Sequence, residues 1–236
     1  MGRHIKIQLS TLLLLLLNGC SKDIPVINEL DDYAICNSRL DACAGRKVGA
    51  YCLFGYKWGE NQDFDETGID ATGPQTPGGT ITFSFQGTGH LINTHRQINV
   101  PSESWDEILD CAQERIRQAV SEWETVTNIT FEELPPNSES DIQFYVAAIV
   151  QSAVAFPNYQ EEPCNILKGD VIFDANSREK SCSGFYINAL HEIGHVLGLG
   201  HVDSESIMVP DGSKFSMHGL QSGDIAGIQQ IYGKKQ

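Results

Sequence analysis

Basic residues are scarce in this chain of 236 residues, which has 16 Lys and Arg against 31 Asp and Glu and a formal net charge of -15. No run of basic residues relieves this imbalance, and an acidic surface repels a phosphate backbone. Nucleic acid is therefore excluded as an expected partner. No internal repeat is visible. Hydrophobic residues make up 41% of the chain, which is enough for one sizeable core in one or two domains.

The sequence also lacks an apolar run long enough for a transmembrane helix, which needs about 20 residues. Residues 9–17 are shorter, follow basic residues and end near Gly19-Cys20, which is the layout of an export signal. Leu17–Cys20 resembles the bacterial lipobox. We therefore expect residues 1–19 to be a signal peptide and Cys20 to carry a lipid. The mature chain would be anchored in a bacterial cell envelope, at the outer membrane or cell surface. A conventional cleavage site or a buried Cys20 is the alternative.

Paired C-x-x-C spacing of a structural zinc site is absent among the first cysteines after Cys20. The chain has seven cysteines, and assigning Cys20 to the lipid leaves an even number. In an exported chain, an even remainder indicates disulfides, although the sequence leaves their connectivity open. The six are Cys36, Cys43, Cys52, Cys111, Cys164 and Cys182.

Residues 20–79 lack a sustained helical period and are rich in Gly, Asp and Asn. Gly73–Gly79 has the composition of a linker. This segment could be a tether, a small cross-linked cap or a latency segment, and the sequence does not choose among them. The pattern changes at Thr80, so we expect a separate domain over residues 80–236.

Residues 80–236 alternate between strand and helix patterns, which predicts an α+β fold. The capping box Ser104-x-x-Glu107 and apolar spacing up to Trp123 predict a long helix. A second helix is expected near Phe185–Leu197, and a third at Ser222–Tyr232 with Gly233 as its stop. Strands are expected at Thr80–Phe85, Asn128–Leu134, Asp141–Ile149, Ser152–Phe156 and Gly169–Phe173.

The second of these helices carries the most specific motif, H-E-x-x-H-x-x-G-x-x-H, from His191 to His201. His191 and His195 share one helical face about 6 Å apart along the axis, so both can reach one zinc ion. A straight helix would carry His201 about 15 Å from His191 and onto another face. His201 therefore joins only if the helix stops, and Gly198 is the residue that allows it.

Three imidazole ligands leave a fourth position on zinc open for water, which is typical of a catalytic site. Glu192 adjoins the first ligand, and we expect it to activate that water as general base and to pass the proton to the leaving amine. An ordinary core helix with satisfied histidines is the alternative, and it explains the five fixed positions poorly.

The motif resembles that of the metzincin peptidases, and further residues point to the matrixins, the matrix metalloproteinase family. Met208, in Ser206-Ile207-Met208, is similar to the methionine of the Met-turn, which lies under the zinc in that family. The resemblance covers about residues 80–236. It includes the strands at Glu139–Phe144, Ala153–Pro157 and Gly169–Asp174 and the terminal helix from Leu220 to Gly233.

The resemblance implies a metzincin catalytic domain with a twisted mixed β-sheet, a long backing helix, an active-site helix and a C-terminal helix. It implies a monomeric zinc endopeptidase that acts on proteins or peptides. The substrate would add as a strand along Ala153, Val154 and Ala155. Val209–Leu220 would line the pocket for the residue after the scissile bond, which is often hydrophobic in this family.

The sequence departs from the matrixin pattern at several positions. Val202 stands where the family usually has Ser or Thr, and the Pro-Arg-Cys-Gly latency motif is absent. Many matrixins hold a second, structural zinc with histidines at the positions of Val154 and Ile172. We therefore expect one zinc, with a bridge involving Cys164 or Cys182 stabilising that region instead. Calcium on Asp170 or Asp174 stays open.

A second hypothesis belongs to another functional class: the chain is a lipid-anchored binding protein on a catalytically inactive metzincin scaffold. Loss of Glu192 or of a histidine ligand would favour it, and all four residues are present. An assay of casein cleavage with and without a chelator discriminates between the two hypotheses.

Overall fold

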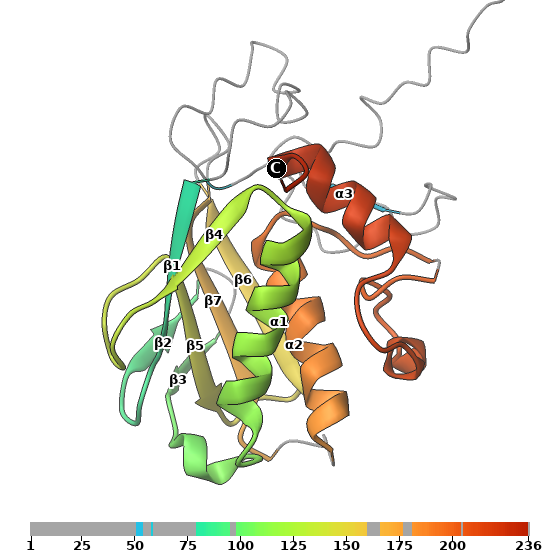
Figure 1. The fold of residues 1–236 in the computed structure, drawn as a ribbon. Coiled ribbons are helices and arrows are strands. Elements are labelled where there is room, and N and C mark those ends of the chain that lie inside the picture. The colour runs from blue at the N-terminus through green and yellow to red at the C-terminus, as the bar shows by residue number, and fades with distance from the viewer. Residues whose placement is uncertain are drawn as a thin grey trace, which may run out of the picture.

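A five-stranded mixed sheet forms the frame of the molecule (Figure 1). The computed structural model describes residues 51–53, 58, 79–94, 98–159, 166–176, 181–203 and 205–235. The strand order is β4-β1-β5-β7-β6, and only β6 runs antiparallel to its neighbour. The strands are β1 (Gly79–Phe85), β4 (Ile129–Glu133), β5 (Ile142–Ala147), β6 (Ala153–Tyr159) and β7 (Ile166–Asp174).

Two helices, α1 (Ala112–Val126) and α2 (Cys182–Val196), lie side by side on one face of the sheet (Figure 1). A third helix, α3 (Ser222–Tyr232), follows the short 3-10 helix η4 (Gly212–Ser216). The α+β fold class with a mixed sheet and these three helices is therefore confirmed.

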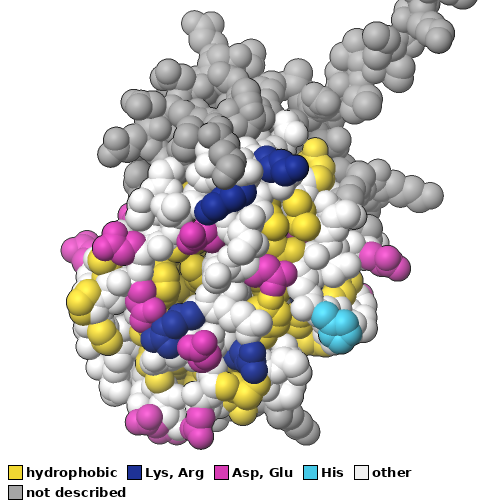
Figure 2. Space-filling model, in the orientation of Figure 1, with side chains coloured by type: hydrophobic (Ala, Val, Ile, Leu, Met, Phe, Trp, Pro, Cys, Tyr) yellow, Lys and Arg dark blue, Asp and Glu magenta, His cyan; other side chains and the backbone are white. Residues whose placement is uncertain are grey.

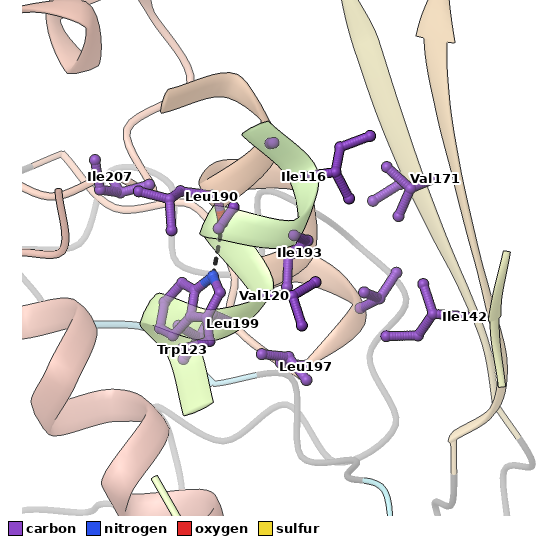
Figure 3. Packing of buried hydrophobic residues seen from close by; sticks show 14 of the residues in the cluster. Ile116, Val120, Trp123, Ile142, Val171, Leu190, Ile193, Leu197, Leu199 and Ile207 are labelled. Carbon is purple, nitrogen blue, oxygen red and sulfur yellow. Dashed lines mark hydrogen bonds between the residues drawn. The ribbon is translucent and has the colours of Figure 1, made fainter. Parts of the chain in front are cut away.

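The main core lies between the sheet and the helices. Trp123 of α1 is fully buried, and its indole N–H donates to the carbonyl oxygen of Leu190 at 3.1 Å (Figure 3). Because Leu190 directly precedes the first histidine of the motif, this bond fixes α1 against the part of α2 that carries the site. Phe144 and Phe173 contribute the sheet side of the same core.

The opposite face of the sheet carries a smaller apolar cluster, in which Ile92, Tyr145, Ala147 and Ile172 are buried. Val154 packs against this cluster and pairs with Ile172 across β6 and β7. These are the two positions at which the resemblance places histidines of a structural zinc. The predicted bridge involving Cys182 is present: Cys182 bonds Cys111, and the bond joins the N-terminal ends of α2 and α1 rather than strands β6 and β7. Cys164 lies outside the described residues.

The prediction of one long helix from Ser104 is wrong. Trp105–Glu107 forms a separate 3-10 helix, η3, and α1 begins only at Ala112. Ser104 does cap η3, but its side chain accepts from the N–H of Asp106. The chain turns extended at Ile108 because Trp105 is fixed to the sheet, where its indole N–H donates to the carbonyl oxygen of Gln86 at 2.9 Å.

Other predicted elements are present with shifted ends. β6 and β7 run to Tyr159 and from Ile166, so both are longer than expected, because they pair with each other. The antiparallel ribbon of β2 (Leu91–Asn93) and β3 (Asn99–Pro101) was not predicted. The terminal helix spans Ser222–Tyr232 as predicted, and Gly233 ends it with φ 77°.

Residues from the predicted N-terminal segment pack into the same core as the catalytic motif. Cys52, Leu53 and Trp58 are buried, and Leu53 forms an isolated β-bridge with Leu199. The predicted signal peptide and Cys20 lie outside the described residues, whereas Gly79, the last residue of the predicted linker, is described as the first residue of β1. Among the helices that the structure describes, none is long and apolar enough for a transmembrane span.

Acidic and basic side chains are interspersed on the face drawn in Figure 2, and its described part shows no continuous basic patch. Arg117 illustrates the arrangement, because its guanidinium pairs with Glu133 at 2.7 Å.

Candidate metal centre

Helix α2 places His191 and His195 on one face, one turn apart, and both side chains are buried. Ser181 caps the start of this helix by accepting from the N–H of Gly184. The helix is apolar on nearly every side, because α1 and the sheet enclose it. The two imidazoles are therefore held within a packed scaffold rather than on a solvated surface.

The chain reverses after α2 and returns His201 to the same place. Gly198 has φ 108°, a conformation that residues with a side chain rarely adopt. The Nε2 atom of His201 lies 3.1 Å from that of His195 and 3.3 Å from that of His191. The predicted stop at Gly198 therefore does bring the third histidine to the first two.

Backbone carbonyls fix the orientation of two of the rings. His191 Nδ1 lies 2.7 Å from the carbonyl oxygen of Ile207, and His195 Nδ1 lies 2.8 Å from that of Leu199. A carbonyl oxygen only accepts, so each Nδ1 must carry the proton. In the neutral rings, the Nε2 lone pairs then point at their common centre.

This arrangement fits zinc. Lone pairs of three nitrogens brought within 3.1–3.3 Å repel one another unless a cation lies between them. Nitrogens held about 2.0–2.1 Å from one tetrahedral zinc are about 3.3 Å apart. Among the described residues, these three histidines form a group whose ligand atoms lie close enough together to hold one metal ion.

Burial also keeps the ligands neutral. It lowers the pKa of His195 to about 3 and the pKa of His191 well below its usual value, and the neighbouring histidines add to the effect. A metal binds the unprotonated nitrogen. Both rings are therefore ready ligands at neutral pH without first losing a proton.

The side chain of Glu192 extends from α2 to the edge strand β6. Its carboxyl group is buried, and burial raises its pKa to about 8, although Lys214 and a backbone hydrogen bond from Ala155 both favour the charged form. The predicted general base and the predicted substrate strand are thus in contact. β6 is an edge strand: in the described sheet it pairs with β7 alone.

Met208, the predicted Met-turn residue, is buried beneath α2, which carries two of the three histidines. A Cβ built on Gly194 would lie 2.5 Å from Met208 Sδ, so the turn packs directly against α2. Asp224 of α3 fixes this turn by accepting from the N–H of Ile207 at 3.0 Å and from the hydroxyl of Ser206.

Two contributors escaped the sequence analysis. Asp224 acts on the site through Ile207, whose carbonyl oxygen accepts from His191. The sequence feature that could have indicated Asp224 is its place at the third position of the terminal helix, where it closes a capping box. Lys214 of η4 is buried, and its charge lowers the pKa of Glu192. Lys214 lies in the segment expected to line a pocket, and a lone lysine in a loop gives no sequence signal.

The carboxylates considered for calcium have other partners. Asp170 forms an ion pair with Lys168 at 3.0 Å, and Asp174 accepts from the N–H of Ile149 at 3.2 Å. Burial raises the pKa of Asp170, with Lys168 opposing the shift. Calcium on these residues stays a prediction without support from their geometry.

Comparison with known proteins gives one consistent result. The family model described as Matrixin matches residues 97–233. The chain is 33% identical to human matrix metalloproteinase-19, over 60% of its own length and 29% of that protein. It is 32% identical to matrix metalloproteinase-27 of Tupaia belangeri, over 61% of this chain and 32% of that protein. Stromelysin-1 of Equus caballus is 28% identical, with 64% and 34% covered. The chain thus spans about a third of the length of these relatives.

Proposed function

The chain belongs to the matrixin family, and on that premise we propose that it is a zinc-dependent endopeptidase that hydrolyses peptide bonds of protein substrates. The observation that carries the proposal is the convergence of three Nε2 atoms within 3.3 Å, with two of the rings oriented by carbonyl oxygens. Histidines that served core packing alone would not need their lone pairs to face one another.

In the proposed mechanism, His191, His195 and His201 hold the metal. Zinc supplies Lewis-acid chemistry for peptide hydrolysis when it is bound. Glu192 acts as general base: it accepts a proton from the attacking water and donates it to the leaving amine. The pKa of its carboxyl group, raised to about 8 by burial, falls again when the neighbouring histidines hold a cation.

The substrate is proposed to bind as an extended strand along β6. The free edge of β6 supports this, because an edge strand offers backbone N–H and C=O groups to a further strand. Ala153, Val154 and Ala155 would provide them. The contact between Glu192 and Ala155 sets that added strand beside the proposed general base.

The alternative of a binding protein on an inactive scaffold gains no support from the site. Hydrolysis would depend on Glu192 and the three histidines; all four are present in the sequence, and the three histidines lie together. The test is cleavage of casein and of a peptide library by the purified chain, with and without a chelator. We expect cleavage that the chelator abolishes. Binding of peptides without any cleavage would support the inactive scaffold instead.

We further propose that the protein is exported and lipid-anchored through Cys20, as its lipobox-like sequence implies. Cys20→Ser should move the protein from the membrane fraction to the soluble fraction without unfolding it. An unchanged membrane fraction would contradict the anchor while leaving the peptidase proposal intact.

A further inference from the structure

Residues from far upstream hold the turn between the second and third histidines of the motif. We call Tyr51, Cys52, Leu53 and Trp58 the N-terminal brace. They lie more than a hundred residues before the turn of residues 196–200 that they contact. The sequence gives no sign of this contact: residues 51–58 are rich in apolar and aromatic side chains, but they match no motif that indicates a partner.

Trp58 caps the end of α2. Its indole N–H donates to the carbonyl oxygen of Val196 at 2.6 Å, and the ring is 5% exposed. The last carbonyls of a helix have no partner within the helix, so this bond satisfies a group that would otherwise be buried unpaired. The hydroxyl of Tyr232 completes the arrangement: it accepts from the N–H of Trp58 at 3.0 Å and donates to the carbonyl oxygen of Leu197 at 2.9 Å.

Cys52 and Leu53 hold the remainder of the turn. The carbonyl oxygen of Cys52 accepts from the N–H of Gly200 at 2.9 Å, and Leu53 forms a β-bridge with Leu199. Gly200 directly precedes the third histidine, and the carbonyl oxygen of Leu199 orients the ring of His195. The brace therefore acts on two of the three histidines through one backbone segment.

Close packing locks the brace in place. A Cβ on Gly227 of α3 would lie 2.8 Å from Tyr51 Cβ, so a side chain at that position would displace the brace. Cys52 is also disulfide-bonded, which ties the brace covalently to another part of the chain.

We propose that the N-terminal brace is a positioning element for the metal centre, and that the zinc-loaded protein retains it rather than releasing it as a latency segment. This inference rests on the proposed zinc site. Groups that orient metal ligands typically change metal affinity 10- to 100-fold when removed. The brace residues would act in this way through the backbone at 196–200.

The test is zinc affinity of the full chain carrying Trp58→Phe, measured by competition with a chromophoric chelator. Phenylalanine keeps an aromatic ring but removes the N–H that caps Val196, so we expect zinc binding to weaken about 10-fold or more. Trp105→Phe is the matched control, because it removes an indole bond to the carbonyl oxygen of Gln86, away from the metal centre. The control should bind zinc as the parent chain does.

Tyr232→Phe provides a second variant if Trp58→Phe does not fold. It removes one hydroxyl that bridges the brace and the turn, and we expect several-fold weaker zinc binding with little change elsewhere. If the folded variants bind zinc with affinities within twofold of the parent, the inference about the brace is overturned and the proposed function stands. A parent chain that binds no zinc would overturn the proposed function as well. N-terminal sequencing of zinc-loaded protein should find Trp58 retained, and a mature form that begins after it would contradict the proposal.

Discussion

Met208 packs against Gly194, so closely that a Cβ at position 194 would lie 2.5 Å from its sulfur atom and 3.2 Å from the ring of Trp123. Gly194 stands between Glu192 and His195 in the motif. The glycine therefore allows the Met-turn and the backing helix to approach the metal-binding helix from beneath.

Gly194→Ala should destabilise the protein, although alanine in a helix is ordinarily favoured over glycine by about 1 kcal/mol. The overpacked methyl group costs about 1–3 kcal/mol, and relief of the clash must move α2 or Met208. We expect a lower free energy of unfolding, measured by denaturant titration, and weaker zinc binding. Gly212→Ala is the control, because its nearest neighbour lies at 3.9 Å. A Gly194→Ala variant more stable than the parent would show that the approach is not tight.

Glu192→Ala should abolish peptidase activity while leaving zinc bound. A general base typically contributes about 10²- to 10⁴-fold to the rate, and the metal affinity depends on the histidines instead. The measurement is kcat on a quenched peptide together with zinc content by elemental analysis. Glu205→Ala, which removes an exposed carboxylate between His201 and Met208, is the control. Full activity of Glu192→Ala would remove this residue from the mechanism.

The bond between Cys111 and Cys182 should stabilise the fold without serving the chemistry. It joins the N-terminal ends of α1 and α2 across 71 residues, and the chain-entropy model gives about 4 kcal/mol for a loop of that length. Cys111→Ser/Cys182→Ser should therefore unfold at lower denaturant concentration. At low temperature it should retain cleavage, because the bond lies at the opposite end of α2 from His195. Equal midpoints for the variant and the parent would refute the stabilising role.

The metal-free protein should be most stable near pH 6.5. Below that pH, the histidines of the unfolded chain become protonated, whereas burial lowers the pKa of His191 and His195 in the folded state. The free energy of unfolding therefore falls with decreasing pH, by up to about 1.4 kcal/mol per pH unit for each of these two histidines. From pH 6.5 towards 8, Glu192 has the opposite effect, because burial raises its folded pKa to about 8 and the unfolded carboxyl ionises first. The measurement is the denaturation midpoint between pH 5 and 8. Glu192→Gln should remove the alkaline loss and steepen the acid one, because the buried carboxyl opposes the histidines below pH 6.5 as well. An alkaline loss that persists in this variant has another source.

Features set by local sequence were predicted well. The terminal helix follows from its apolar spacing and Gly233, and the return of His201 follows from the stop at Gly198. Both depend on conformational preferences that a few neighbouring residues fix. The matrixin family was also identified from such local motifs, and the family model confirms it.

Features set by distant contacts were missed. The break at Ile108 follows from the anchoring of Trp105 on the sheet, and helical spacing continues through it. Trp58 caps Val196 from the segment of residues 20–79, which was predicted to be separate from residues 80–236. In both cases the partner is a backbone carbonyl elsewhere in the chain. Every residue has such a carbonyl, so the sequence does not indicate which one will be the partner.

Titration of metal-free protein with zinc, followed by peptide cleavage, tests the central claim most directly. Activity should be absent without metal and should rise linearly to a plateau at one zinc per molecule. A second tight zinc is not expected, because Val154 and Ile172 pack in an apolar cluster where many matrixins have histidines. Cleavage by the metal-free protein, or a plateau reached only at two zinc ions per molecule, would contradict this account.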